Sequence, residues 1–249
     1  MSYREVLFRE YTNNIYRSMI SISEASYTQR EHVFKKRFSK FLPSSKDAAI
    51  LDIGCGLGFF LWFLQQGGYT NVVGIDVSPQ QIEVAENHGV KGLQLCDWKT
   101  YLVDKHSQFD FILLDNVIEH LHKDEIVEML ARILLSLKPG GRVYVSTPNA
   151  GSPFGIAHAF IDFTHEVYFT PASLSQVILS CGFSSVYVFG EPLFAVDILS
   201  FLRKTVFNII KPFIKAAYII GAGGGGRTHI SHYIEPIIAA FAEKPIARQ

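Results

Sequence analysis

The sequence has few cysteines, no excess of charge of either sign and no long uninterrupted apolar run. Its three cysteines, Cys55, Cys96 and Cys181, lie far apart in a chain of 249 residues and form no C-x-x-C pair. This spacing argues against a disulfide framework and a cysteine zinc cluster, and it favours a reducing cytoplasm. Because 23 basic residues balance 23 acidic ones, the chain also lacks the basic excess typical of a general nucleic-acid-binding protein.

Signals that direct a chain to a membrane are missing as well. No apolar signal core follows the first charged residues, and no uncharged apolar stretch reaches the roughly 18 residues that a membrane-spanning helix needs. The composition is nevertheless apolar for a soluble protein, with 48% hydrophobic residues and a mean hydropathy of +0.18. The distribution of these apolar residues therefore needs an explanation.

Short apolar runs alternate with segments of helical periodicity through most of the chain. Strands are expected over residues 48–53, 72–77, 93–96, 109–114, 142–146, 185–189 and 237–242. Helices are expected over residues 1–42, 59–66, 123–137 and 171–181, and one more begins at Pro79. The alternation predicts an α/β fold with a doubly wound, mostly parallel sheet and helices on both faces.

A glycine-rich loop follows the first expected strand. Residues 51–58 read Leu-Asp-Ile-Gly-Cys-Gly-Leu-Gly, and such glycines allow a sharp turn and a close approach to a ligand. In a doubly wound sheet, ligands bind beyond the carboxyl ends of the strands, which is where this loop lies. The dinucleotide fingerprint G-x-G-x-x-G requires a glycine at position 59, where Phe59 stands. An NAD-dependent oxidoreductase is therefore disfavoured.

Acidic residues close the next two strands. A carboxylate at Asp76 can accept hydrogen bonds from both hydroxyls of a ribose. A carboxylate at Asp97 can bind an adenine amine, and the adjacent indole of Trp98 can pack on the ring. The alternative for any one aspartate is that it caps the following helix. Three ordered signals at successive strand ends favour the ligand-binding interpretation.

Together these motifs resemble those of the class I S-adenosylmethionine-dependent methyltransferases, in the small-molecule branch similar to methyltransferase types 11 and 12. The resemblance covers residues 50–58, 73–78, 96–98, 109–121 and 137–143. It implies S-adenosylmethionine as the cofactor and a seven-stranded sheet whose last strand is antiparallel and lies beside the sixth. The cofactor-binding residues that it implies are Asp52, Gly54, Cys55, Gly56, Gly58, Asp76, Val77, Asp97, Trp98 and Asn116.

The acceptor of the methyl group is less constrained. The fourth strand ends in Asp115-Asn116-Val117-Ile118, not in the Asn/Asp-Pro-Pro-Tyr/Phe of enzymes that methylate nucleic-acid bases or glutamine, which argues against a nucleic-acid substrate. Residues 165–171 resemble a His-x-x-x-(Phe/Tyr)-Thr-Pro segment of bacterial methyltransferases of sugar and cell-envelope pathways. The resemblance implies O-methylation of a sugar or envelope-glycan precursor. The alternatives are a quinone-type or other lipophilic small molecule, and a non-catalytic scaffold that keeps the cofactor.

Two histidines are candidate catalytic residues, because a hydroxyl acceptor must lose its proton to a base of near-neutral pKa. His165 is the first candidate for this base, and its alternative role is a hydrogen bond within its loop. His120 is expected to line the acceptor pocket, and the neighbouring Glu119 to orient the methionine end of the cofactor. A metal site is possible in principle from Asp115, Asn116 and the neighbouring histidines, but no recognised ligand spacing supports one, so none is expected.

A single methyltransferase domain is expected over residues 1–249. Its parts are an N-terminal helical cap (1–42), a cofactor-binding core (43–190), a helical insertion over the acceptor site (191–235), and the last strand and tail (236–249). Residues 227–233, which follow a run of glycines, are expected to form a lid or a connector.

Within the insertion, residues 193–220 predict a basic amphipathic helix that Pro212 should kink or split. Its apolar side suits a membrane surface or a lipid-linked acceptor. The alternatives are packing on the enzyme's own core and contact with a second subunit in a homodimer. The expected location is the cytoplasm, with peripheral contact at the inner membrane surface as one alternative.

Overall fold

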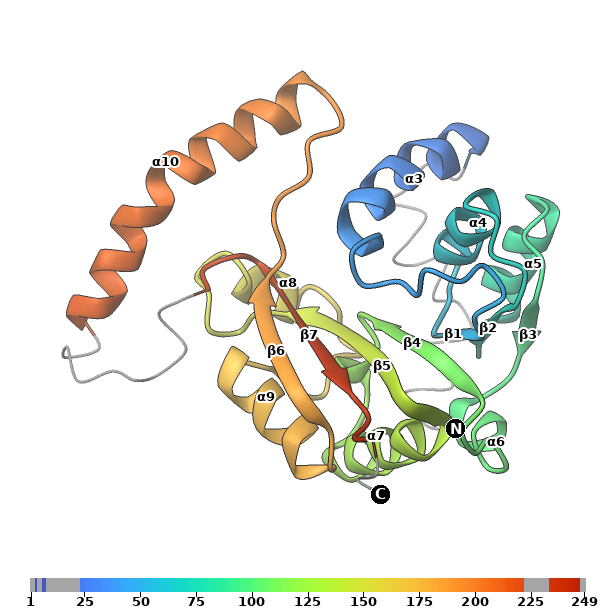
Figure 1. Ribbon diagram of the computed structural model, residues 1–249. Helices are drawn as coiled ribbons and strands as arrows, with labels where there is room; N and C mark the ends of the chain where they lie inside the picture. Colours follow the sequence, from blue (N-terminus) through green and yellow to red (C-terminus); the bar gives the residue numbers. More distant parts are fainter. Residues whose placement is uncertain (1–2, 4–5, 8–22, 222–232, 247–249) are drawn as a thin grey trace.

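The computed structural model describes residues 3, 6–7, 23–221 and 233–246 (Figure 1). Within these residues, seven strands form one sheet in the order β3-β2-β1-β4-β5-β7-β6. The strands are β1 (Ile50–Ile53), β2 (Val72–Asp76), β3 (Leu93–Leu95), β4 (Phe109–Asp115), β5 (Leu137–Pro148), β6 (Ser184–Gly190) and β7 (Ile237–Glu243). Strand β7 runs antiparallel between β5 and β6, and the other pairs are parallel. The predicted fold class and the predicted place of the last strand are confirmed.

Helices cover both faces of the sheet. They are α3 (Glu24–Phe38), α4 (Phe59–Gln66), α5 (Pro79–Asn87), α6 (Trp98–Tyr101), the 3₁₀ helix η2 (Ile118–His120), α7 (Lys123–Ser136), α8 (Ile156–Phe160), α9 (Pro171–Ser180) and α10 (Ile198–Gly221). Two of them begin in the same way. The hydroxyls of Ser78 and Thr170 accept hydrogen bonds from helical N–H groups. Pro79 and Pro171 occupy the first helical position, where a missing N–H costs nothing.

The central strands are buried on both sides, and their side chains alternate between two apolar clusters. Leu51, Ile112 and Leu114 face the cluster that includes α7 and α9. Ile50 and Phe111 face the cluster that includes α3 and α4. Burial in these two clusters accounts for part of the high mean hydropathy, as expected for parallel strands covered on both faces.

Two sequence expectations about element ends are wrong. The helix expected to reach residue 42 ends at Phe38, and residues 39–42 form turns. The strand expected over residues 142–146 begins at Leu137 instead, because Leu137 pairs with Phe109 and the Gly141 carbonyl accepts a hydrogen bond from Lys244 N. A register shift at the start of β4 accommodates this early pairing. Pairing partners that are distant in sequence therefore extend the strand beyond its local signal.

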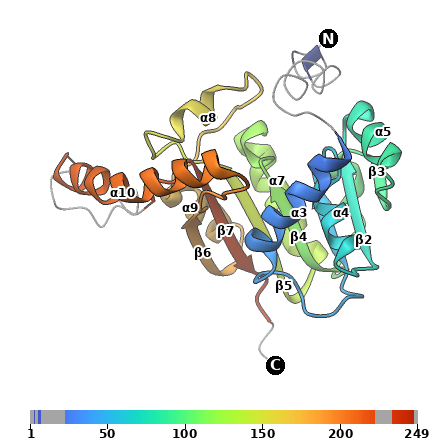
Figure 2. The same ribbon diagram turned by 90° about the horizontal axis from the view of Figure 1, so that it is seen from above.

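Helix α10 lies between β6 and β7 in the chain and extends away from the sheet in both views (Figures 1 and 2). It continues through Pro212 as one helix, so the predicted split is wrong. The Phe207 ring packs on Phe154 with centroids 5.3 Å apart, and Lys211 forms an ion pair with Glu235. Among the described residues, no helix is long and apolar enough to cross a membrane. Most of the predicted lid, residues 227–232, lies outside the described residues.

Candidate active site

The glycine loop after β1 is held against the ends of two neighbouring strands. Gly54 and Gly56 have φ of +73° and +53°, angles that favour glycine. A Cβ on Gly54 would lie 2.5 Å from Val117, and a Cβ on Gly56 would lie 2.6 Å from Gln81. Gly58, with φ of +69°, precedes the first residue of α4. The loop can therefore adopt this path only with glycine at these positions, and it brings the N-terminus of α4 to the carboxyl edge of the sheet.

The carboxylate of Asp76 fixes the end of β2 to this loop. Its Oδ2 accepts a hydrogen bond of 2.8 Å from Gly56 N, and its Oδ1 accepts one of 2.8 Å from Ser78 N. Burial raises the pKa of Asp76, and these N–H donors oppose the rise. Each oxygen keeps lone-pair capacity for a further donor, as binding of a ribose diol requires. The exposed side chain of Val77 follows directly.

Three carboxylates converge where the adjacent strands β2, β1 and β4 end. Burial raises the pKa of Asp52 well above its usual value, and the nearby charges of Asp115 and Asp76 add to the rise. Such a group of acids favours a cationic ligand. S-adenosylmethionine, which carries a sulfonium, an ammonium and a ribose, fits this set of residues.

The remaining predicted cofactor residues have structural partners of their own. Asp97 accepts a hydrogen bond of 2.7 Å from Lys99 N and so caps α6. The Trp98 indole is buried in the core cluster, where it packs on protein atoms. Cys55 is buried as well, and burial raises the pKa of its thiol well above the usual value. Asn116 adopts φ of +56° and donates to Asp115 Oδ1. The helix-capping alternative for Asp97 is therefore observed, and the adenine-binding role of Asp97 and Trp98 stays a prediction.

Glu119, His120 and His165 come together beyond the end of β4. The two histidines are 45 positions apart in the chain, yet the centroids of their rings lie 4.7 Å apart. The carbonyl oxygen of Glu119 accepts hydrogen bonds of 2.7 Å from Glu166 N and 3.2 Å from Val167 N. These bonds tie the segment that carries His165 to η2. The structure thus places both predicted catalytic histidines in one site.

The hydrogen bonds of the two rings determine which nitrogen carries the proton. His165 Nδ1 lies 2.7 Å from the Ala159 carbonyl, which can only accept, so Nδ1 is the donor. The Thr164 hydroxyl donates to Asp162 Oδ1 at 2.7 Å and therefore accepts from His120 Nδ1, also at 2.7 Å. In the neutral form, both rings consequently present Nε2 as an acceptor.

The Glu119 carboxyl group is buried beside these rings. It is 2% exposed, and neither oxygen has a hydrogen-bond partner among the described residues. Burial raises the pKa of Glu119 to about 8. Thr147 lies close enough to lower this pKa slightly, although its hydroxyl is also without a partner of normal geometry. Sequence reasoning identified Glu119 but gave no indication of this burial.

The family of the chain follows from a match that spans these elements. Residues 27–188 match the model of the methyltransferase domain family. The chain belongs to this family. Its glycine loop, strand-end acids and seven-stranded sheet are those of a class I S-adenosylmethionine-dependent methyltransferase, so the resemblance stated from the sequence is confirmed.

Individual relatives were found among curated sequences and among solved structures, and they align with different shares of this chain. A ubiquinone biosynthesis O-methyltransferase of Bradyrhizobium sp. (strain ORS 278) is 31% identical over 58% of this chain and 61% of its own length. A protein of the same name from Xylella fastidiosa (strain 9a5c) is 37% identical over 45% of this chain and 46% of its own length. A SAM-dependent methyltransferase from Archaeoglobus fulgidus superposes with a TM-score of 0.66 at 21% identity, over 98% of this chain and 100% of that one. The chain thus spans about half to three fifths of the two curated relatives, and the solved structure supports the fold alone.

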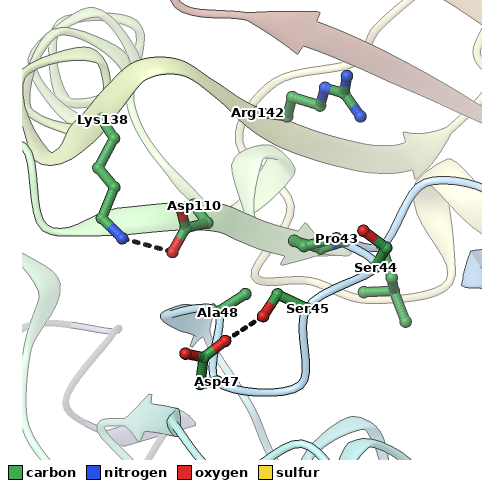
Figure 3. A pocket seen from close by; sticks show the side chains of 9 residues that line it. Pro43, Ser44, Ser45, Asp47, Ala48, Asp110, Lys138 and Arg142 are labelled. Carbon is green, nitrogen blue, oxygen red and sulfur yellow. Dashed lines mark hydrogen bonds and ion pairs between the residues drawn. The ribbon is translucent and has the colours of Figure 1, made fainter.

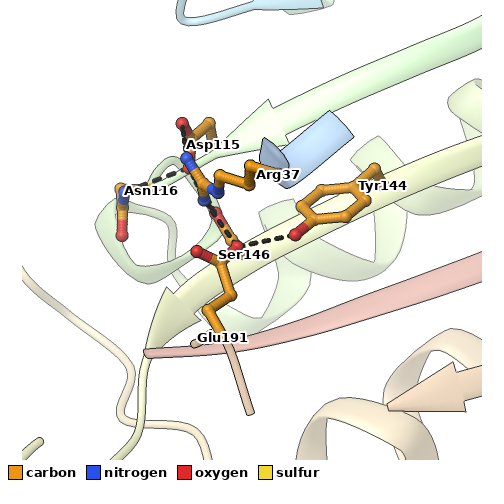
Figure 4. Close-up of polar contacts among 6 residues, drawn as sticks. All are labelled: Arg37, Asp115, Asn116, Tyr144, Ser146 and Glu191. Carbon is orange, nitrogen blue, oxygen red and sulfur yellow. Dashed lines mark hydrogen bonds and ion pairs between the residues drawn. The ribbon is translucent and has the colours of Figure 1, made fainter. Parts of the chain in front are cut away.

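A buried ion-pair network adjoins the methyltransferase site and was missed by sequence reasoning (Figure 4). The Arg37 guanidinium donates to both carboxylate oxygens of Asp115, at 2.7 and 2.6 Å, and to Glu191 Oε1 at 2.6 Å. The hydroxyl of Tyr144 donates to the same Glu191 oxygen, and that of Ser146 donates to Asp115. Burial raises the pKa of Asp115, but Arg37 outweighs this and holds it below its usual value. No single motif in the sequence contains all of these residues, which come from α3, β4, β5 and the segment after β6.

A cavity of about 560 Å³ lies at the opposite, amino-terminal edge of the sheet (Figure 3). It is lined by residues 42–45, 47 and 48 and by Asp110, Lys138 and Arg142. Lys138 and Asp110 form an ion pair of 2.6 Å across it. None of the strand-end acids or histidines lines this cavity. The chemistry of the methyltransferase therefore belongs to the carboxyl edge, as the fold predicts.

Proposed function

We propose that this methyltransferase transfers a methyl group from S-adenosylmethionine to a hydroxyl oxygen of a lipophilic small molecule, and that His165 and His120 handle the hydroxyl proton. The observation that carries this proposal is the pair of imidazoles whose Nε2 atoms are acceptors, located beyond β4 and next to the cofactor loop. The names of the two curated relatives support oxygen as the acceptor atom.

When bound, the cofactor supplies a methyl group on a positively charged sulfur, and transfer forms a C–O bond while the C–S electrons return to sulfur. The glycine loop and Asp76 would hold its ribose, and the Asp52 and Asp115 region favours its positive charge. His165 Nε2 takes the proton that the acceptor hydroxyl loses. The Ala159 carbonyl then stabilises the resulting imidazolium through Nδ1, and Asp162 does the same for His120 through the Thr164 hydroxyl.

The side chains around His165 favour a lipophilic acceptor. Phe163, two residues before His165, is 83% exposed, and Phe160 and Ile161 are 64% and 61% exposed. Exposed apolar side chains beside a catalytic group suit an apolar substrate or a membrane surface. Together with the relatives' names, they favour a quinone-type phenol. The sugar or envelope-glycan precursor suggested by residues 165–171 is the second candidate.

A second exposed apolar surface is a stripe along α10. At 100° per residue, its members fall within one 80° arc: Ile198, Leu202, Val206, Ile209, Phe213 and Ile220. Phe207 and Lys211, which contact the rest of the protein, lie on the other side. The exposure of these side chains argues against the alternative in which the stripe packs on the enzyme's own core.

The rest of the helix surface, away from the stripe, carries Arg203, Lys204 and Lys215. A basic polar face opposite an apolar stripe suits an anionic lipid surface better than a second apolar helix. We therefore propose peripheral contact with the cytoplasmic face of a membrane, where a lipophilic acceptor would be concentrated. Flotation with anionic liposomes at low salt checks this contact. The paired change Ile209→Ser and Phe213→Ser should leave the protein at the bottom of the gradient. Dimerisation without flotation would favour the homodimer instead.

The test of the reaction is a screen with isotope-labelled cofactor over prenylated catechols, nucleotide sugars and lipid-linked sugars. Mass spectrometry should find an O-methyl product from a catechol. His165→Gln should lower kcat about 10²-fold without changing the thermal shift that the cofactor causes. His158→Gln is the matched control, since His158 is exposed on nearby α8. Methylation of nitrogen, or full turnover in both His165→Gln and His120→Gln, would contradict the proposal.

A further inference from the structure

We propose that Glu119, His120 and His165 form a binding site for a divalent transition-metal cation, and that this cation binds the acceptor hydroxyl. The first part of the proposal concerns the site itself and needs no catalytic activity. The second part rests on the function proposed above. Sequence spacing gave no indication of such a site, because His165 lies 45 and 46 residues beyond the other two ligands.

The donor set and its dimensions fit a single ion. One ligand atom from each of the three side chains lies within 4.8 Å of the others. Ligands bound at about 2.0–2.2 Å stand roughly 3.0–3.6 Å apart around one ion, so binding requires a contraction of at most about 1.8 Å. Two imidazoles and one carboxylate are typical ligands of Zn²⁺, Mn²⁺, Co²⁺ and Fe²⁺. Three protein ligands also leave coordination positions open for an acceptor oxygen.

The surroundings of the two imidazoles are those of metal ligands. A metal-binding histidine usually donates its second ring N–H to a carbonyl or carboxylate, which fixes the ring and leaves the other nitrogen to the metal. His165 does this through Ala159, and His120 does it through Thr164, which is itself bonded to Asp162. The hydrogen bonds from Glu166 N and Val167 N to the Glu119 carbonyl fix the two ligand segments to each other. Both rings are thus pre-oriented.

The Glu119 carboxyl group supplies the independent observation. It is 2% exposed, and neither of its oxygens has a hydrogen-bond partner in the described part of the chain. A buried carboxyl group without a donor is costly, and buried charges are normally paired or bound to metals. A cation at this place would bind the unpartnered carboxylate and the two Nε2 atoms together. Bound to such a cation, an acceptor hydroxyl loses its proton more readily.

The experiment begins with protein freed of metal by EDTA and dialysis. Co²⁺ is titrated by visible absorption, which responds to imidazole ligation, and Mn²⁺ by the paramagnetic resonance of the free ion. Wild-type protein should bind one equivalent of Co²⁺. His120→Gln, His165→Gln and Glu119→Gln should each weaken binding at least 10-fold, while His158→Gln should bind as wild type. A circular dichroism spectrum equal to that of wild type shows that each variant is folded.

Two results would overturn the metal site: no stoichiometric binding by wild type, or equal binding by wild type and the His120→Gln and His165→Gln variants. Activity separates this proposal from the function above. Metal binding without any O-methyl product contradicts the proposed function but still supports the metal site. If metal-free protein methylates the hydroxyl at an unchanged rate in EDTA, the cation has no role in the reaction. That result still supports the proposed O-methyltransferase activity.

Discussion

Replacing Arg37 with methionine should destabilise the protein far more than removing a surface arginine. Arg37 is 10% exposed and pairs with Glu191, which is 8% exposed, and with Asp115, which is 22% exposed. Its removal leaves two mostly buried carboxylates without their cation. Breaking a buried ion pair by removing one partner costs about 3–5 kcal/mol, and Arg37 serves two partners at once. We therefore expect a loss near the upper end of this range.

The assay is urea unfolding followed by circular dichroism at pH 7. With a slope of about 3 kcal/mol/M, the midpoint should fall by roughly 1–2 M. The matched control is Arg142→Met, since Arg142 is 46% exposed and forms a 3.5 Å ion pair with Glu243. Such a surface pair contributes at most about 1 kcal/mol.

The pH dependence provides a second check on the Arg37 prediction. Without Arg37, the pKa values of Asp115 and Glu191 should rise, because the nearby positive charge is gone. The variant's native state then binds protons more readily than its unfolded state as the pH falls. The difference in free energy of unfolding between wild type and the variant should therefore become smaller as the pH falls from 7 to 5. A loss no larger than that of Arg142→Met, or a deficit equal at both pH values, would refute the reasoning.

Three further predictions concern the cofactor side. Gly54→Ala should destabilise the protein more than Gly89→Ala, because both glycines have positive φ but only a Cβ on Gly54 meets a neighbour within 4 Å; thermal melting compares the two. Asp52→Asn should raise the Tm and lower the affinity for S-adenosylmethionine. The pKa of Asp52 is raised in the folded protein. Wild-type stability therefore falls as the pH rises above about 3.9, the pKa of an ordinary aspartate. The increase in Tm that Asp52→Asn causes should accordingly grow with rising pH. Asp76→Ala should abolish the thermal shift with S-adenosylmethionine; a retained shift would move the ribose site elsewhere.

The cofactor half of the site was predictable because its determinants are local. Each signal lies where one strand ends: the glycine loop after β1, Asp76 after β2 and the Asp115-Asn116 pair after β4. Parallel strands bring these ends to a common edge, so a list of strand ends nearly specifies the site. The sequence is less informative at Trp98, where it shows an aromatic residue at the right place but cannot show that its ring is buried in the core.

The acceptor half depends on contacts between distant segments, which no local pattern reports. Both histidines were named from their positions, but their 4.7 Å approach follows from hydrogen bonds between the Glu119 carbonyl and the segment after His165. The orientation of α10 could not be predicted from the sequence either. Its amphipathic pattern predicts two faces, and the structure shows that the apolar one points away from the protein.

The N-terminal helix α3 is better described as part of the catalytic domain than as a cap. The Tyr27 hydroxyl donates a 2.7 Å hydrogen bond to the Leu57 carbonyl in the glycine loop, and burial raises the pKa of this hydroxyl to about 12. Phe38 lies eleven residues, or about three turns, after Tyr27 on the same helix. Its ring is fully buried against the sheet, next to Arg37 of the ion-pair network. One helix therefore supports the glycine loop at its start and the carboxylates of Asp115 and Glu191 at its end. A truncation that removes α3 should abolish the thermal shift with S-adenosylmethionine, because the loop and Asp115 both belong to the cofactor half of the site.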